Sequence, residues 1–250
     1  MTTPAYDELV ELVRRDGTAL VEAVRGDLDA PVRTCGDWDA RRLLAHVGRV
    51  YRMVATLLMT RAQVAPRDKP PSAGADVVEY CAEGLAMVAD AFAATPPDAD
   101  VWNWVADRPA AAVWWARRTA YETVVHRADA ELAVGRSPSP VEPALAADAI
   151  DEFLEVMLPR QQSRAAADGL VGTVHLHATD LDEPPGAGEW LLTLTPTTCE
   201  IRRGHAKGDV AVRGTAGDLL LVVYNRLPPE SVEVHGDARL LDVWRTKVRV

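Results

Sequence analysis

The sequence predicts an α+β protein, with an N-terminal four-helix bundle followed by a small C-terminal α/β domain. Two observations lead to this prediction. Apolar residues recur at helical spacing over the first 159 residues, and short alternating stretches separated by glycine and proline follow. The charge balance changes at the same place. Residues 160–250 are almost neutral, with 11 basic and 12 acidic side chains, so most of the chain's net charge of −10 lies in the first 159 residues. We therefore expect domains at residues 1–159 and 165–250, joined near residues 160–168.

The first two helices are predicted from capping residues and apolar stripes. Thr2-Thr3-Pro4 offers a hydroxyl cap and an early proline for a helix that runs to about residue 24. A second helix is expected over residues 37–60, because the Asp37 side chain can cap its free amides. The two apolar stripes consist of Leu9, Leu12, Val13, Leu20 and Val24 in the first helix, and Leu43, Val47, Val50, Val54, Leu57 and Leu58 in the second.

Three further helices are expected in the first domain. A loop over residues 65–73 holds three prolines and precedes a helix at residues 76–94, which Thr95-Pro96-Pro97 stops. A fourth helix covers residues 109–132 and closes at Gly135, and a shorter one covers residues 143–158. Long helices joined by loops of this kind are typical of an antiparallel bundle.

The second domain is predicted to combine short strands with two helices, which is typical of a small α+β layer. The expected strands are residues 171–178, 189–195, 199–203, 210–213 and 231–235, and the expected helices are residues 215–225 and 237–247.

Composition excludes several classes of function. A chain this acidic is not expected to attract nucleic acid or anionic lipid. The first residues form no signal peptide and no apolar run reaches the roughly 20 residues of a spanning helix, so we expect a cytoplasmic monomer without membrane partners. The three cysteines, Cys35, Cys81 and Cys199, include no CxxC pair. The sequence also lacks the GxSxG, Walker A, GxGxxG and HExxH motifs.

Three residues form a candidate metal site. Glu122 and His126 lie four positions apart on the fourth predicted helix and therefore share one face. His46 lies on the apolar stripe of the second helix, so all three side chains can face the bundle core. Two imidazoles and a carboxylate are the ligands of several catalytic zinc sites, which keep a further position open. Two alternatives remain, namely a solvated Glu122–His126 pair and a hydrogen-bonded core histidine at His46.

The segments around these residues carry a family resemblance. Residues 38–47, WDARRLLAHV, and residues 117–131, RRTAYETVVHRADAE, resemble segments of the DinB-like, mycothiol-dependent maleylpyruvate isomerase family of actinobacteria. The resemblance implies that His46, Glu122 and His126 bind a divalent metal, usually taken as zinc. The second domain resembles the family's C-terminal module of sterol-carrier-like topology, and residues 221–226, LVVYNR, resemble a stretch whose arginine serves the active site. Arg226 is accordingly the candidate catalytic residue.

The same resemblance implies a thiol chemistry. Mycothiol, the low-molecular-weight thiol of actinobacteria, would bind at the open metal position as a thiolate, because a thiol that coordinates a metal loses its proton. A thiolate that adds to an activated alkene, allows rotation and leaves again isomerises a small unsaturated dicarboxylate of the maleylpyruvate type. If sulfur cannot leave, the same site makes a conjugate as a mycothiol S-transferase. A third hypothesis is a non-catalytic small-molecule-binding protein in which the metal is structural and has four protein ligands.

Other residues have an interpretation that needs no ligand. Arg226 can hold a substrate carboxylate through two parallel hydrogen bonds, but it can equally be a surface arginine after a helix. His175 and His177 alternate on one strand face and are expected to be exposed, with a second metal site as the minor alternative. Arg127 and Asp129 flank the metal ligands and are expected to form a structural ion pair or to orient a ligand. The tryptophans Trp102, Trp104, Trp114 and Trp115 are expected in the core.

Overall fold

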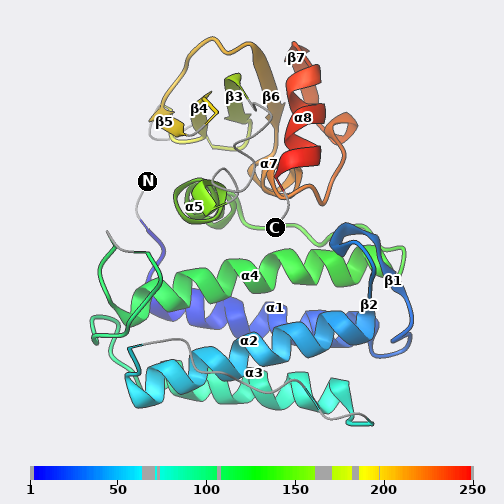
Figure 1. The fold of residues 1–250 in the computed structure, drawn as a ribbon, viewed down its shortest axis with the longest axis vertical. Coiled ribbons are helices and arrows are strands. Elements are labelled where there is room, and N and C mark those ends of the chain that lie inside the picture. Colours follow the sequence, from blue (N-terminus) through cyan, green and yellow to red (C-terminus); the bar gives the residue numbers. More distant parts are fainter. Residues whose placement is uncertain are drawn as a thin grey trace. The chain divides into compact units, whose positions relative to one another are not determined.

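A computed structural model describes most of the chain and divides it into two compact units (Figure 1). The helical unit comprises Pro4–Ser139, and the sheet unit comprises Pro140–Val250 together with Met1–Thr3. The structure describes residues 3–63, 71, 74–105, 108–160, 171–181, 186–196 and 198–248.

The described residues of the helical unit form a bundle of α1 (Tyr6–Val24), α2 (Ala40–Thr60), α3 (Val77–Ala93) and α4 (Ala112–Ala133). Helix α1 packs against α4 and α3, and α2 packs against α3 and α4, which confirms the predicted four-helix arrangement (Figure 1). The core contains the predicted stripes, with Leu9, Leu20, Leu43 and Leu57 all fully buried. At the end of α4, Gly135 adopts a φ of 73°, a conformation that favours glycine and ends the helix where the sequence predicts.

Helices α2 and α3 contact each other through their backbones. A Cβ atom placed on Gly84 of α3 would lie 2.9 Å from the carbonyl oxygen of Gly48 on α2. A Cβ atom on Gly48 would lie 3.0 Å from the Cα of Cys81. The absence of a side chain at these two positions therefore sets how closely the helices approach.

The start of α2 differs from the prediction. Strands β1 (Pro31–Val32) and β2 (Trp38–Asp39) pair around the short 3₁₀ helix η1 (Arg33–Cys35), so the chain is still extended at residue 39. Asp39 caps the helix, with its carboxylate 2.7 Å from the Arg42 amide, and the prediction of Asp37 as cap was wrong. Asp37 contacts the Arg42 guanidinium instead, at 3.1 Å.

The start of α1 differs as well. Its N-cap is Ala5, which makes no side-chain capping hydrogen bond, and Pro4 precedes that residue. Thr2, one of the two threonines predicted to supply a cap, lies outside the described residues. The helix begins without the hydroxyl cap that the sequence predicted.

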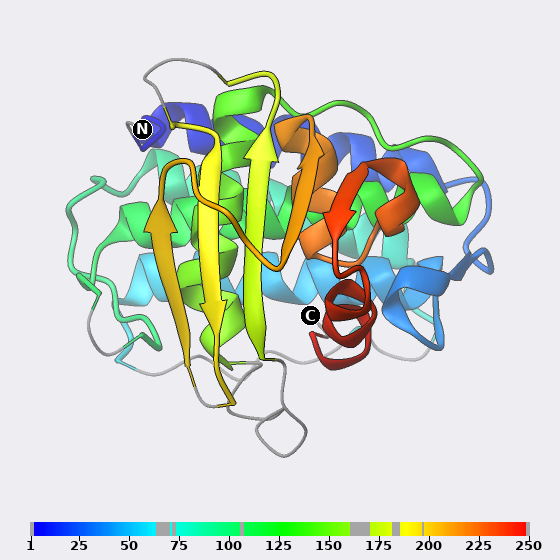
Figure 2. The ribbon, with the colours of Figure 1, turned by 90° about the horizontal axis from the view of Figure 1, so that it is seen from above.

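The sheet unit contains a mixed sheet with the strand order β5-β4-β3-β6-β7 among the described residues (Figure 2). Strands β3 and β6 are parallel and the other neighbouring pairs are antiparallel. Helix α7 (Ala216–Val223) packs against β3 and β6, and its Thr215 cap accepts a hydrogen bond from the Asp218 amide. The strands are β3 (Gly172–Ala178), β4 (Glu189–Leu194), β5 (Cys199–Arg203), β6 (Val210–Gly214) and β7 (Glu233–Gly236), and the last helix is α8 (Arg239–Lys247).

The fifth predicted helix belongs to the sheet unit. Helix α5 (Pro143–Glu152) continues as the π-helix η2 (Phe153–Met157) and packs against α7. The Trp190 indole of β4 donates to Asp151 at 2.9 Å, and Phe153 packs against Tyr224 with ring centroids 4.6 Å apart. The units therefore divide after Ser139, shortly before α5 begins at Pro143, and not near residues 160–168 as predicted, because the apolar face of α5 completes the core of the sheet unit.

Some predictions concern segments that the structure does not describe. The predicted linker lies mostly outside the described residues, as does the predicted loop at residues 65–73 apart from Pro71. Within the described part of the chain, no helix combines the length and the apolar character needed to span a bilayer.

Candidate metal centre

The structure brings together His46 of α2 with Glu122 and His126 of α4. The Glu122 Oε1 atom lies 3.2 Å from His46 Nε2 and 3.3 Å from His126 Nε2. The two imidazole rings have centroids 5.1 Å apart and are nearly perpendicular, at 74°. One potential ligand atom from each side chain lies within 4.8 Å of the other two, so the three can hold a single ion.

Local helix geometry explains this convergence. Glu122 and His126 are one turn apart on α4, so their side chains leave the helix on the same face. Helix α2 packs against α4 and places His46 opposite them. The solvated alternative for the Glu122–His126 pair was wrong, because the His126 residue is only 7% exposed.

A further set of polar groups orients the two α4 side chains. Arg118, one turn before Glu122, donates to Glu122 Oε2 at 2.5 Å. Asp129 lies 2.8 Å from His126 Nδ1, and its two oxygens also accept hydrogen bonds from the Thr34 hydroxyl at 2.5 Å and the Cys35 thiol at 3.4 Å. Asp129 is fully buried. Arg118 therefore holds Glu122 through Oε2, and Asp129 holds His126 through Nδ1. The Glu122 Oε1 and His126 Nε2 atoms remain to converge with His46.

The sequence analysis missed Arg118 and Thr34. The spacing of Arg118, four residues before Glu122, was a usable signal, because it places a cation on the same helix face. No comparable signal exists for Thr34, which reaches Asp129 from the 3₁₀ helix η1, 95 positions earlier in the chain.

Arg127 and Asp129 have separate roles. Arg127 donates to the carbonyl oxygen of Ser139 at 2.8 Å and lies near the carboxylates of Asp16 and Glu131. These contacts tie the end of α4 to α1 and to the following segment, which is a structural role. Asp129 instead contacts a candidate metal ligand.

The electrostatics of the cluster favour a positive charge between its carboxylates. Burial alone would raise the pKa of Glu122, but the Arg118 guanidinium and hydrogen bonds to His126 and His46 hold it well below its ordinary value. Burial alone would lower the pKa of His126, but hydrogen bonds to Asp129, Cys35 and Glu122 hold it well above its ordinary value. The carboxylates therefore stabilise a cation at His126, and a divalent ion would satisfy the same requirement.

An aromatic ring covers the two histidines. The Trp38 ring centroid lies 5.0 Å from that of His46 and 6.5 Å from that of His126, to which it is nearly parallel at 23°. The Arg42 guanidinium lies 5.2 Å from the Trp38 ring centroid. Trp38 is the tryptophan of the segment that carries the family resemblance, and here it packs against both imidazoles.

The donor set fits a divalent transition metal. Two imidazole nitrogens and one carboxylate oxygen converge, while Cys35 and Asp129 form a separate group with His126, in which Asp129 contacts the Nδ1 atom of the ring. Three protein ligands leave a position for an exogenous ligand, as in catalytic zinc sites, whereas structural zinc sites are closed by four.

Arg226 belongs to the sheet unit and is buried, with 6% of its surface exposed. Its guanidinium donates to the carbonyl oxygen of Tyr224 at 2.7 Å and lies 5.9 Å from the centroid of the Tyr224 ring. The interpretation of Arg226 as a surface residue was therefore wrong. Its role in binding a substrate carboxylate stays a prediction.

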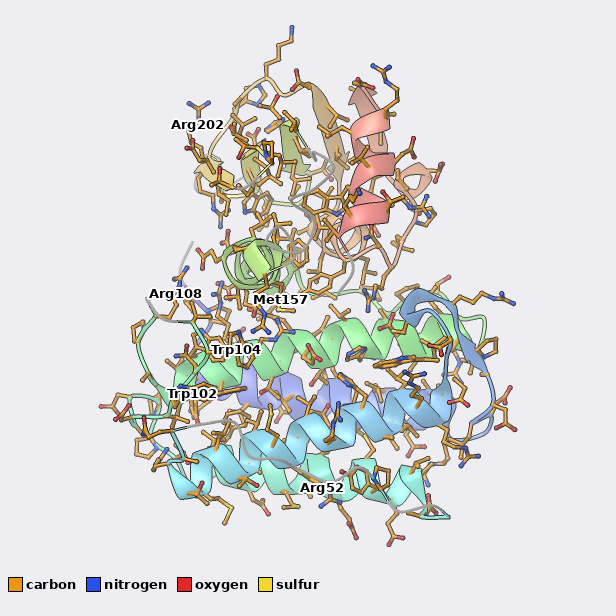
Figure 3. All side chains as sticks on the ribbon, in the orientation of Figure 1. Arg52, Trp102, Trp104, Arg108, Met157 and Arg202 are labelled. Carbon is orange, nitrogen blue, oxygen red and sulfur yellow. The ribbon has the colours of Figure 1, made fainter. Side chains whose placement is uncertain are left out.

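Of the four tryptophans predicted in the core of the helical unit, Trp115 is buried, whereas Trp102, Trp104 and Trp114 are half-buried. Trp104, Trp114 and Trp115 form mutual edge-to-face pairs with centroids 4.7–5.0 Å apart. Trp115 is almost fully buried, and its indole donates to the carbonyl oxygen of Trp102 at 2.7 Å. Trp102 and Trp104 lie near the start of α4 (Figure 3).

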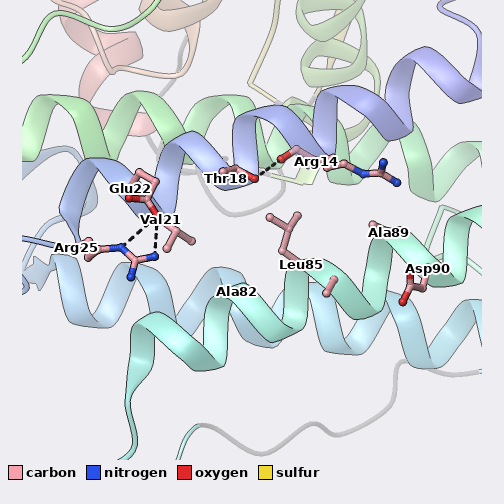
Figure 4. Close-up of a pocket in the computed structure, with 10 residues that line it drawn as sticks. Arg14, Thr18, Val21, Glu22, Arg25, Ala82, Leu85, Ala89 and Asp90 are labelled. Carbon is pink, nitrogen blue, oxygen red and sulfur yellow. Dashed lines mark hydrogen bonds and ion pairs between the residues drawn. The ribbon is translucent and has the colours of Figure 1, made fainter.

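A separate groove lies between α1 and α3, on helices that do not carry the metal cluster. It has a volume of about 480 Å³ and its lining includes Thr18, Leu85 and Ala89 (Figure 4). Thr18 donates to the carbonyl oxygen of Arg14 and Arg25 pairs with Glu22 along the rim. The residues that line this groove include no histidine.

Two family models together match most of the chain. Residues 10–131 match a family model described as the mycothiol maleylpyruvate isomerase N-terminal domain, and residues 144–242 match the C-terminal domain model of the same family. The gap between the two matches contains the division between the units. None of the curated protein sequences matches the chain.

Two solved structures are similar in fold. One is described as the mycothiol-dependent maleylpyruvate isomerase and the other as a histidine-to-alanine mutant of it. The TM-scores are 0.57 and 0.56, the sequence identity is 16% in both cases, and each comparison covers 94% of this chain and 95% of the other.

Proposed function

Because the chain belongs to the mycothiol-dependent maleylpyruvate isomerase family, we propose that it is a metal-dependent enzyme that uses mycothiol to isomerise a small unsaturated dicarboxylate from cis to trans. The observation that carries this proposal is the convergence of His46, Glu122 and His126 on one point. The ion would be zinc, which suits two imidazoles and a carboxylate. When bound, it would supply a Lewis acid that keeps a thiol deprotonated at neutral pH.

The residues of the chain have defined tasks in this proposal. Asp129 accepts a hydrogen bond from Nδ1 of His126 and so leaves Nε2 facing Glu122 and the ion. Arg118 holds one oxygen of Glu122 at 2.5 Å and leaves the other free to face both histidines. Trp38 packs on the two imidazoles and excludes water from that side.

A turnover assay with added metal, mycothiol and maleylpyruvate tests the proposal. An isomerase converts the substrate with mycothiol in catalytic amounts, because the thiol is released unchanged in every turnover. We expect the zinc-loaded chain to convert many equivalents of substrate for each equivalent of mycothiol, followed by absorbance and by mass spectrometry. The same preparation carrying His46→Ala should lose this activity, and one carrying His235→Ala, a change at an exposed histidine in the sheet unit, should keep it.

Two other outcomes would contradict the isomerase proposal in different ways. Consumption of mycothiol one for one, with a conjugate of higher mass, would identify an S-transferase that shares the site. No thiol-dependent change with a panel of unsaturated acids and other electrophiles, at full metal loading, would exclude the mycothiol chemistry and favour a binding protein.

Arg226→Lys tests the proposed role of this arginine in binding a substrate carboxylate. Lysine keeps the charge but lacks the planar pair of donors, so we expect KM for a dicarboxylate substrate to rise about 10-fold or more, the loss of one good charge-assisted hydrogen bond. Zinc content should be unchanged. The matched control is Arg213→Lys, at an arginine that pairs with Glu233 on β7. Equal kinetics for the two variants would remove Arg226 from the substrate site.

A further inference from the structure

A second group of histidines gathers on the sheet unit. His175 and His177 lie on β3 and Glu189 lies on β4, directly opposite His177. His205 follows β5 in the loop that leads to β6. The three strands concerned lie side by side in the sheet (Figure 2).

The alternation of the strands places these side chains on one face. Leu176 of β3 pairs with Trp190 of β4, whose indole donates to Asp151 of α5, so these residues face the helices. His175, His177 and Glu189 are one position removed and therefore point to the opposite face. In Figure 2 the sheet is seen from this opposite face.

The potential ligand atoms converge on one carboxylate oxygen. Glu189 Oε2 lies 2.9 Å from His175 Nε2, 2.7 Å from His205 Nδ1 and 4.0 Å from His177 Nδ1. The rings of His175 and His205 are perpendicular, with centroids 5.3 Å apart. Exposed histidines were predicted here, but His175 is only 4% exposed.

The chemistry of the group suits a divalent cation. Within the described part of the chain, the ion pairs of Glu189 all involve histidines and include no lysine or arginine. Imidazole together with carboxylate is a donor set that suits zinc and its neighbours in the first transition row.

We propose that His175, Glu189 and His205, whose potential ligand atoms all lie within 4.8 Å of one another, form a second divalent transition-metal site. Donors around a tetrahedral zinc ion with bonds of about 2.0–2.1 Å lie about 3.3 Å apart, so the present contacts must open by a few tenths of an ångström. His205 permits this, because its side chain is 79% exposed and lies on a loop next to Gly204. An ion held by these three residues would fasten the β5–β6 loop to β3 and β4.

Zinc stoichiometry of the full-length, untagged chain tests this site independently of the first. After equilibrium dialysis against zinc, we expect the wild-type chain to hold two ions, and His205→Ala and His126→Ala to hold one each. The double variant should hold none. His205 is exposed, so its removal should not prevent folding, and His235→Ala is the control for loss of an exposed histidine.

Thermal unfolding supplies a second measurement. Zinc that binds only the folded chain raises Tm in proportion to the logarithm of its concentration above Kd. We expect this rise in the His126→Ala chain, and its loss when His205→Ala or Glu189→Gln is added. Zinc content and zinc-dependent Tm that are unchanged by His205→Ala would overturn the proposal. So would a His126→Ala chain that binds no zinc, or that binds one ion regardless of residue 205.

Discussion

Replacement of His126 with alanine is expected to remove one zinc ion per chain and to abolish thiol-dependent turnover. Loss of a hydrogen-bonded partner behind a ligand already weakens metal binding about 10–100-fold, and loss of one of three ligands should cost more. We therefore expect binding at the α2–α4 cluster to weaken by more than about 100-fold. Elemental analysis of the purified chain, before and after dialysis against zinc, measures this change.

Folding controls accompany the measurement. His126 is buried and hydrogen-bonded to Asp129, so the alanine variant also leaves a buried carboxylate without one of its donors. Circular dichroism and the unfolding midpoint should show a folded but less stable chain. Removal of His46 avoids this complication, since its side chain is 24% exposed, and should give the same loss of zinc. Equal zinc content in wild type and both variants would refute the assignment of these ligands.

Asp129→Asn is expected to weaken zinc binding by about 10–100-fold while all three ligands stay in place. With zinc bound at Nε2, the Asp129 carboxylate would keep the His126 proton on Nδ1 and make Nε2 a stronger metal ligand. An asparagine can still accept the hydrogen bond, but it brings no charge. Competition with a chelator of known affinity gives the change in Kd.

A structural role for Asp129 would give a different result. The matched control is Asp16→Asn, at a buried aspartate of α1 that pairs with Arg15 and lies near Arg127. If both variants lose stability equally and bind zinc as the wild type does, Asp129 is structural only. The nitrogen chemical shifts of the His126 ring provide a readout that stability does not affect, because they report which nitrogen carries the proton.

The bundle could be predicted because its helices have clear apolar periodicity and end at residues that terminate helices. Apolar stripes predicted α1 and α2, and prolines and Gly135 marked where α3 and α4 end. The start of α2 could not be placed, because the pairing of β1 with β2 keeps Asp39 extended, and this pairing depends on residues that carry no strand-like alternation. Tertiary contacts determined that boundary.

The assignment of α5 shows the same limit at a larger scale. The periodicity of residues 143–158 correctly predicted a helix. A single apolar face, however, does not indicate whether the helix packs in the core of the helical unit or of the sheet unit. The helix and its π-helical continuation contact Tyr224 and Trp190 of the sheet unit, which are far away in the sequence. For the candidate site, spacing predicted which of the α4 residues share a face, whereas Thr34 and the Glu189 group depend on strands and loops whose register the sequence does not reveal.

The contact between Gly48 and Gly84 limits which substitutions the site of His46, Glu122 and His126 can tolerate. Gly48 lies two residues after His46 on the same helix, and its backbone touches that of α3. A methyl group at either glycine would displace α2 against α3. Metal–ligand bonds accept distance errors of only about 0.2 Å, which is less than such a displacement. The accuracy of the His46 position therefore depends on two residues that have no side chain and no chemistry of their own.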